Sequence, residues 1–436
     1  MKSISNLFMG DRVIWVVYFF LCIISLVEVF SAASTLAYKS GSFWDPLIKQ
    51  ALFLSVGTLV VIAVHRVPCR VFKAVPIFMI PISLILLSVT FFMGAITNGA
   101  KRWLEIGGVP FQPSELAKGS LIIAVALVLS RMQTEDGADR KAFKYILILS
   151  ALICLPIFPE NLSTACLLFG VVVLMMFIGR VPLLQLGKML GVLFTVGALG
   201  VMILLSLPKS ENSTDDGLLH RFSTWNNRIT KHFASDEDDK AAKLDPALFD
   251  IDKDAQIAHA NIAIASSNGI GKLPGNSVER DFLSQAFSDF IFAIIIEEMG
   301  IFGAAFVVLL YLILLFRAAR IANRCENNFP AFLVMGLALL LVTQAMFNMM
   351  VAVGIVPITG QPLPLISQGG TSTIINCAYI GMILSVSRYT AYLEEKKENP
   401  APLLTQSEGN ETIASEAQTA AEPTAEVLNS DAKFEE

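Results

Sequence analysis

Ten apolar segments of about 20 residues constrain this chain more than any other feature of its sequence. A helix needs roughly 20 apolar residues to span the hydrocarbon core of a bilayer. Hydrophobic residues make up 54% of the 436 and charged residues only 16%, which is unlike a soluble protein. We therefore predict an all-α, polytopic membrane protein. The segments are 13–36, 46–64, 72–93, 114–131, 144–158, 161–179, 183–207, 289–316, 330–353 and 368–387.

Lysines and arginines in the short connections predict the orientation, because positively charged connections stay in the cytoplasm. They crowd one side, from the groups at 66–73 and 131–144 to those at 317–324 and 388–397. The short loops on the other side hold only Lys39, Lys49, Lys101 and Arg102. Both termini are therefore expected in the cytoplasm, and the loops 94–113, 208–288 and 354–367 on the outer face.

The long loop 208–288 and the C-terminal tail are the two large polar regions. The second half of the loop contains Ile257–Ala265, whose pattern predicts a short amphipathic helix. The residues after Tyr392 are polar and poor in aromatics, so we predict a membrane domain over 1–392 and a disordered cytoplasmic tail over 393–436. Cysteines in or beside apolar segments predict no disulfides, and the histidines lack the spacing of zinc ligands.

Asp289 stands where the long loop returns to an apolar segment. Ionisable groups at such a position are candidates for function. The alternative is that Asp289 caps the helix that follows, a role that Ser288 could share. Glu297 and Glu298 lie two turns further along, beyond the reach of capping, and at most one of them faces the same side as Asp289.

Polar residues in and around the other outer loops leave similar alternatives open. Glu115 and Lys118 are i, i+3 neighbours at a helix start, where the carboxylate either complements the helix dipole or shares a polar cavity with the lysine. Arg102 is either an interfacial anchor or a site residue. Glu28 is either an interhelix hydrogen-bond partner or a residue of a lipid groove. The stretch 354–372, with three prolines and four glycines, is interpreted as a re-entrant or groove-lining element rather than a linker.

Three motifs resemble the SEDS family of bacterial membrane proteins (shape, elongation, division and sporulation). They are Asn-Gly-Ala-Lys-Arg-Trp to Gln-Pro-Ser-Glu-Leu-Ala-Lys (98–118), Asp-Phe-Ile-Phe-Ala with Glu-Glu-x-Gly (289–300), and Pro-Leu-Pro-Leu-Ile-Ser-x-Gly-Gly-Thr-Ser (362–372). The resemblance covers nearly all of residues 10–390 and is nearer to the division branch than to the elongation branch. It implies a peptidoglycan glycosyltransferase of the bacterial inner membrane that polymerises lipid II and releases undecaprenyl pyrophosphate.

The resemblance also implies partners and a site. A class B penicillin-binding protein and other division proteins are the expected partners, and the active site would lie on the extracytoplasmic face. The family's catalytic aspartate falls on Asp289, which suits a general base. The leaving pyrophosphate needs cations or a metal, so a divalent cation is the one candidate cofactor, with no metal ligand assigned. The expected substrate-binding residues are Arg102, Glu115, Lys118, Arg221, Lys272, Arg280, Glu297, Ser367, Gly369 and Gly370.

The chain departs from the family pattern in three places. Ser284 to Asp289 lacks the His and Glu of the usual Pro-Glu-x-His-Thr-Asp, the glycines of 271–277 are fewer, and Pro159–Thr164 replaces Asp-Leu-Gly-Thr. Three other functions compete with the septal polymerase. They are a lipid II flippase, an elongation-type polymerase, and a scaffold that recruits the transpeptidase.

Overall fold

The computed structural model describes residues 9–32, 44–97, 100–107, 109–206, 255–283 and 286–398. Most of the predicted long loop, including Arg221, and the tail from residue 399 therefore lie outside the described residues. The chain divides into two units, Met1–Thr390 and Ala391–Glu436, and the fold below is that of the first.

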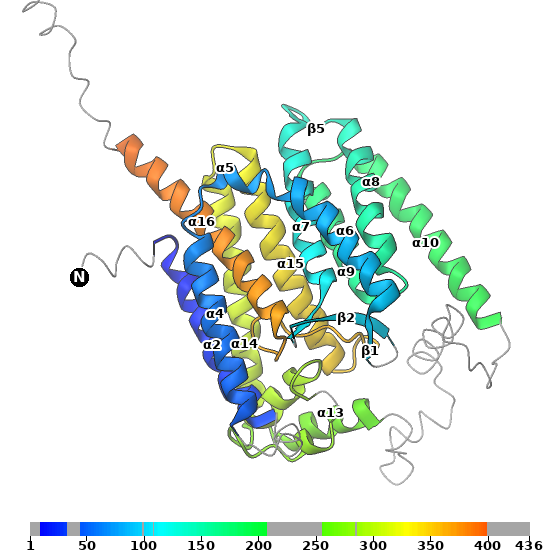
Figure 1. The fold of residues 1–436 in the computed structure, drawn as a ribbon, viewed down its shortest axis with the longest axis vertical. Coiled ribbons are helices and arrows are strands. Elements are labelled where there is room, and N and C mark those ends of the chain that lie inside the picture. The colour runs from blue at the N-terminus through cyan, green and yellow to red at the C-terminus, as the bar shows by residue number, and fades with distance from the viewer. Residues whose placement is uncertain are drawn as a thin grey trace, which may run out of the picture. The chain divides into compact units, whose positions relative to one another are not determined.

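Ten helices of at least 17 residues dominate the described part of the chain (Figure 1). Seven of the helices found there are long and apolar enough to cross a membrane. The predicted all-α, polytopic membrane fold is confirmed, while the count of ten spans stays a prediction. The helices are α2 (Arg12–Ala32), α4 (Asp45–Val64), α6 (Val75–Met93), α7 (Pro113–Arg131), α8 (Arg140–Ile157), α9 (Leu162–Ile178), α10 (Leu183–Ser206), α14 (Ile291–Arg324), α15 (Asn328–Ala352) and α16 (Thr371–Glu398).

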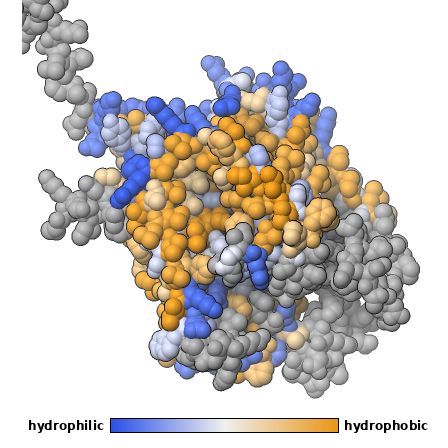
Figure 2. Space-filling model, viewed as in Figure 1, coloured by the Kyte–Doolittle hydropathy of each residue, from blue (hydrophilic) through white to orange (hydrophobic). Residues whose placement is uncertain are grey.

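Large apolar side chains cover the outside of the bundle. Phe92, Phe194 and Phe302 are each more than three-quarters exposed. Figure 2 shows such side chains across the middle of one face, with hydrophilic side chains towards its ends. An exposed apolar surface of this extent indicates contact with lipid.

The centre of the bundle is filled by α7, α14 and α15. Of these, α15 packs on both α7 and α14, and α7 also contacts α6, α8 and α9. Leu121, Ile122 and Val125 on α7 and Ile294 and Ile295 on α14 have no exposed surface. The described core is thus mainly apolar, with a few polar side chains placed among it.

The two ends of the bundle carry different small elements (Figure 1). At one end, which we call the sheet end, lie α13 (Ala255–Ser266), η1 (Glu279–Asp281) and a small antiparallel sheet. The opposite end carries α5 (Cys69–Phe72) and a hairpin of β4 (Gln133–Thr134) and β5 (Gly137–Ala138). The helix α13 confirms the short amphipathic helix predicted in the long loop.

The sheet at the sheet end was not expected from the sequence. It has the order β1-β2-β3, with β1 at Ala95–Thr97, β2 at Ala100–Ile106 and β3 at Val109–Phe111. Two of these strands are only three residues long, too short for alternation to predict them. The sheet matters because β2 carries Arg102.

The helix α14 begins later than predicted and is broken within its first three turns. Gly300 interrupts it with φ 68° and ψ −171°, and the segment 269–273 inserts into the break. Lys272 N donates to Glu297 O at 2.9 Å, and Ile301 N donates to Gly269 O at 3.1 Å. In an unbroken helix Ile301 N would bond to Glu297 O, so the inserted segment replaces a bond of the helix itself.

Candidate functional site

The turn before α14 is fixed by hydrogen bonds to three successive carbonyls. Phe287 O accepts from Gln368 N at 3.0 Å, and Ser288 O accepts from Ser367 Oγ at 2.6 Å. Asp289 O accepts from Asn348 Nδ2 at 2.8 Å. The backbone that carries the Asp289 side chain is therefore held by α15 and by the loop that precedes α16.

Asp289 does not cap the helix, so the capping interpretation was wrong. The residue at the cap is Phe290, and the helix start has no side-chain cap. The turn continues one residue past Asp289, which places its carboxylate outside the first turn of α14. Ser288 Oγ donates to Asp289 Oδ1 at 3.1 Å, and Asp289 is half-buried.

Arg102 and Asp289 approach each other at Gly360. A Cβ atom on Gly360 would lie 3.1 Å from Arg102 Nη1 and 3.5 Å from Asp289 Oδ2. The residue has φ +66°, which glycine adopts readily and other residues rarely do. A side chain at this position would occupy the space between the guanidinium and the carboxylate, so glycine keeps that space open.

A cavity of about 240 Å³ adjoins this pair. Arg102 forms part of its wall, and so does Thr359, which directly precedes Gly360. The start of α9 contributes Glu160 and Asn161, and the rest of the wall is mainly apolar, including Phe347. The site therefore combines two opposite charges with an adjoining, partly apolar pocket.

The irregular loop before α16 is packed inside the protein. Leu363, Leu365 and Ile366 are at most 2% exposed, and Leu365 has φ +67°. A leucine in that region costs about 1–2 kcal/mol. Hydrogen bonds from Ser25 to Ile366 O at 2.7 Å and from the Tyr311 hydroxyl to Pro364 O hold it there. This loop is buried in protein and borders a cavity, as irregular backbone at membrane depth must be.

Glu115 and Lys118 form a fully buried ion pair. Their oxygen and nitrogen lie 2.8 Å apart, with side-chain exposures of 1% and 0%. Lys118 Nζ also donates to Gln344 Oε1 at 2.8 Å, and Gln344 Nε2 donates to Pro362 O at 3.2 Å. The pair thus supports the loop that carries Gly360, and the simple dipole interpretation of Glu115 is insufficient.

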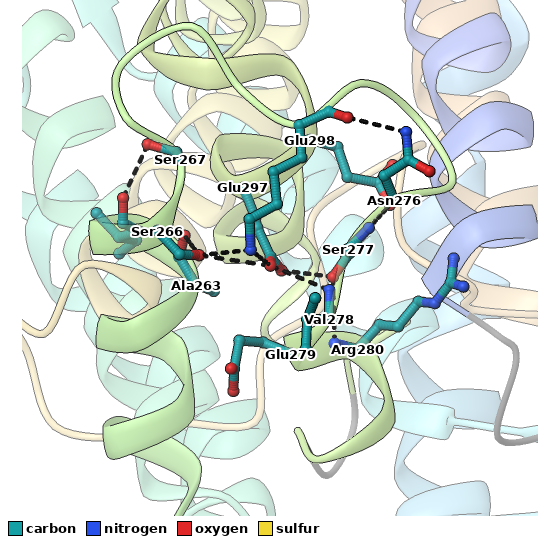
Figure 3. Close-up of polar contacts among 12 residues, drawn as sticks. Ala263, Ser266, Ser267, Asn276, Ser277, Val278, Glu279, Arg280, Glu297 and Glu298 are labelled. Atoms are coloured by element: carbon teal, nitrogen blue, oxygen red, sulfur yellow. Dashed lines mark hydrogen bonds and ion pairs between the residues drawn. The ribbon is translucent and has the colours of Figure 1, made fainter.

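A second cluster surrounds Glu297 (Figure 3). Its buried carboxylate accepts from Lys272 Nζ at 2.6 Å, from Ser277 Oγ at 2.5 Å and from Val278 N at 3.1 Å. Lys272 Nζ also donates to Ser266 Oγ at 2.9 Å. These contacts fasten the end of the long loop to α14, and they give Lys272 and Glu297 structural partners.

Arg280, in η1, and Glu298, on α14, form a neighbouring group with Ser31 of α2. Arg280 Nη1 donates to Ser31 Oγ at 3.0 Å and to Gly275 O at 2.9 Å, and Ser31 Oγ donates to Glu298. Glu28, also on α2, has no exposed surface, and its carboxylate oxygens have no hydrogen-bond partner among the described residues. Neither sequence interpretation of Glu28 is confirmed, because its side chain has no exposed surface for lipid and makes no interhelix hydrogen bond among the described residues.

The structure thus separates the predicted site residues. Arg102 lies near Asp289. Glu115 and Lys118 support the loop that carries Gly360. Lys272 and Arg280 bind the clusters around Glu297 and Glu298. Ser367 is buried, with its hydroxyl engaged by Ser288 O and Leu363 N. A Cβ atom on Gly370 would make an ordinary contact with Phe53 Cζ at 3.7 Å. A Cβ atom on Gly369 would clash with Ser372 Oγ at 2.2 Å.

The sequence interpretation missed Gln344, Asn348 and Gly360. A signal for the first two was present, because Gln344 and Asn348 are polar, four residues apart and therefore on one face of an apolar helix. Among the described residues, no three His, Cys, Asp or Glu side chains converge as metal ligands would.

The fold and site define a helical, polytopic membrane protein with a carboxylate and a guanidinium beside a cavity at one end of its bundle. The model of the FtsW, RodA and SpoVE cell cycle proteins matches residues 11–392, so the chain belongs to this family. It is 29% identical over 390 residues to the probable peptidoglycan glycosyltransferase FtsW of Halomonas elongata, covering 88% of this chain and 91% of that protein.

Two further relatives show the same likeness. The chain is 30% identical over 384 residues to the probable peptidoglycan glycosyltransferase FtsW of a Geobacter species, covering 86% and 96% of the two chains. It is 27% identical over 344 residues to the peptidoglycan glycosyltransferase MrdB of Escherichia coli, covering 78% and 85%.

Solved structures share the fold. A chain of a peptidoglycan synthase complex that coordinates polymerization and crosslinking superposes with a TM-score of 0.64 at 22% identity, covering 87% of this chain and 98% of that one. The rod shape determining protein RodA of Thermus thermophilus superposes with a TM-score of 0.59 at 22% identity, covering 88% and 98%.

Proposed function

We propose that this chain is a peptidoglycan glycosyltransferase that polymerises lipid II into glycan strands during septal wall synthesis. Membership of the FtsW, RodA and SpoVE family supports the activity, as do relatives named for it at 29% and 30% identity. The observation that carries the proposal is the meeting of Asp289 and Arg102 at Gly360, beside a cavity with a partly apolar wall.

The proposed reaction needs a base at the acceptor and positive charge at the leaving group. Asp289 takes the proton of the acceptor hydroxyl as its oxygen forms a bond to the anomeric carbon of the donor. The bond from that carbon to the pyrophosphate oxygen breaks, and its electron pair leaves on undecaprenyl pyrophosphate. A positioned base contributes typically ~10²–10⁴ in rate. The proton on Asp289 then passes to solvent.

Arg102 is the cation of the predicted set that the described structure brings to Asp289. Its guanidinium suits the pyrophosphate, because a planar fork of donors matches phosphate oxygens. A divalent cation stays part of the proposal. Mg²⁺ is commonly held by one or two carboxylates together with substrate phosphates, and no residue is assigned as its ligand, because Asp289 is needed as the base.

The proposal places the sheet end on the extracytoplasmic side, with both termini in the cytoplasm. The connections at the opposite end carry Arg66, Arg70, Lys73, Arg140 and Lys141, and positive charge favours the cytoplasmic side. The substrate's isoprenoid would lie against the apolar surface of the bundle while its sugars reach Asp289.

A class B penicillin-binding protein that crosslinks the strands is the proposed partner. The similarity to a chain from a complex that coordinates polymerization and crosslinking is consistent with such a partner.

Septal rather than lateral synthesis predicts that depletion of this protein leaves filaments, whereas depletion of an elongation polymerase leaves rounded cells.

The flippase alternative gains no support from the described core. A flippase needs a polar path through the bilayer, whereas the described centre is filled by apolar side chains such as Ile122, Ile294 and Ile295. A scaffold would need neither the open space at Gly360 nor the cavity beside it.

Labelled lipid II incubated with the purified chain and its transpeptidase tests the proposal. We expect wild-type protein to form glycan strands and Asp289→Ala to form none, with transpeptidase binding retained. Undiminished glycan from Asp289→Ala would contradict the proposed site. Lipid II translocation without any polymer from the wild type would instead support the flippase.

A further inference from the structure

Two polar atoms in the wall of the cavity beside Arg102, Thr359 Oγ1 and Asn161 Nδ2, have no hydrogen-bond partner among the described residues. Thr359 is 7% exposed, and its Oγ1 has no hydrogen-bond partner among the described residues. Asn161 is 6% exposed, and its Oδ1 accepts from Thr164 N at 3.1 Å while its Nδ2 has no partner there. A buried polar group without a partner costs about 1–3 kcal/mol, so a ligand that supplies partners to both groups would recover that cost.

The composition of the wall indicates a neutral, hydroxyl-bearing ligand. Asn161 offers an amide donor, and Thr359 offers a hydroxyl that can donate or accept. The wall carries one carboxylate, Glu160, and one guanidinium, Arg102, so its formal charges balance, which favours a neutral ligand in the cavity over a pyrophosphate. Phe347 and Ile358 provide an apolar side against which the ring face and the acetyl methyl of an amino sugar could pack.

The size of the cavity is also restrictive. Pockets for drug-sized ligands typically hold about 300–1,000 Å³, and this cavity holds about 240 Å³. It has room for one sugar ring with its acetyl group, and not for a disaccharide with its peptide. Because Thr359 directly precedes Gly360, a ring in the cavity lies next to the space shared by Arg102 and Asp289.

We propose that this cavity binds the terminal N-acetylhexosamine ring of the acceptor, whose hydroxyl Asp289 deprotonates. The assignment rests on the proposed function. Thr359 and Asn161 act as specificity-determining residues, which hydrogen-bond the substituents of the ring. Arg102 marks the boundary between this sugar subsite and the place of the pyrophosphate.

Two conservative variants test the subsite. Thr359→Val keeps the shape and removes the hydroxyl, and Asn161→Ser keeps an oxygen that can cap α9 and removes the amide donor without adding a charge. The affinity of each full-length variant for lipid II is measured in nanodiscs, in an Asp289→Asn background that slows turnover. Undecaprenyl pyrophosphate, which has no sugar, is the second probe. Thr195→Val is the control, since that hydroxyl lies exposed on α10 and bonds to Val192 O at 2.9 Å of its own helix.

We expect each variant to raise the Kd for lipid II about five- to tenfold, the effect of one lost hydrogen bond. The Kd for undecaprenyl pyrophosphate should stay unchanged, and so should both constants in Thr195→Val. Thermal stability should be equal or higher in Thr359→Val, because that change removes an unpartnered polar atom. A purely structural role for Thr359 would instead lower stability.

The outcomes separate this inference from the proposed function. Unchanged lipid II affinity in both variants, with an active wild type, would overturn the sugar subsite alone. Equally weakened binding of both probes would mean that the lipid pyrophosphate occupies the cavity, and this result would also overturn the sugar subsite. Failure of the wild type to bind or polymerise lipid II would overturn the proposed function and the subsite with it.

Discussion

Arg102 Nη1 and Asp289 Oδ2 face the same empty position, the one that a Cβ atom on Gly360 would occupy. Arg102 comes from a strand of a small sheet, and Asp289 from the turn before a buried helix. The sequence around neither residue predicts that it lies near the other. The meeting of the two charges is the basis for most of the predictions that follow.

Arg102 is expected to stabilise the leaving group rather than to hold the fold. Arg102→Gln should lower kcat for lipid II polymerisation about 100-fold, the typical effect of losing one transition-state donor. Arg102→Lys should recover part of that loss, because it restores the charge without the planar fork. Steady-state kinetics of the two variants provide the check. Equal activity of Arg102→Gln and the wild type would remove Arg102 from the mechanism.

Gly360→Ala should reduce turnover more than its strain alone explains. The new methyl group would lie between the guanidinium and the carboxylate, and φ +66° would cost about 1–2 kcal/mol. Gly354→Ala is a matched control. Gly354 lies in the same loop at φ +75°, and its Cβ would meet only Asn261 Oδ1 at 3.9 Å.

Both glycine variants should therefore lose similar thermal stability, and only Gly360→Ala should lose most of its polymerase activity. Parallel melting curves and product gels measure the two effects. Equal loss of activity in both variants would show that strain, and not the space at Gly360, is responsible.

Lys118→Met should destabilise the protein strongly. It leaves the buried Glu115 carboxylate without its cation, and breaking a buried pair costs about 3–5 kcal/mol. Glu115→Gln combined with Lys118→Met should recover much of that stability. Thermal denaturation in detergent measures both changes. A double variant less stable than Lys118→Met alone would argue against an ion pair as the source of the effect.

The Lys272 and Glu297 pair should fasten the long loop to α14. Because Lys272 is 28% exposed, we expect Lys272→Met to cost only about 1–2 kcal/mol. Lys144→Met, at an exposed position on α8, should cost little. A double-mutant cycle with Glu297→Gln isolates the coupling. A coupling energy near zero would mean that the backbone bonds of 269–273 hold the loop without help from the ion pair.

Local motifs predicted part of this site correctly. Glu115 and Lys118 are three residues apart on one helix, so their pairing follows from helix geometry. The position of Asp289 at the return of the loop was also visible in the sequence. The alternative that Asp289 caps the helix was wrong, because Phe290 stands at the N-cap, and the residue at which a helix begins depends on the tertiary contacts of the preceding turn.

Contacts between distant segments could not be predicted in this way. Lys272 was expected to contact substrate, yet it pairs with Glu297, because the loop enters the break in α14. Nothing in the local pattern of either residue specifies that approach. Asn348 was missed for a related reason, since its partners are carbonyls of the two segments that it joins.

The most direct test of the account is the Asp289→Asn variant, which keeps the size of the side chain and removes its ability to accept a proton. Glycan synthesis from labelled lipid II should fall by about 10²–10⁴, while the Kd for lipid II stays close to that of the wild type. Glycan synthesis at the wild-type rate would contradict the assignment of Asp289 as the base.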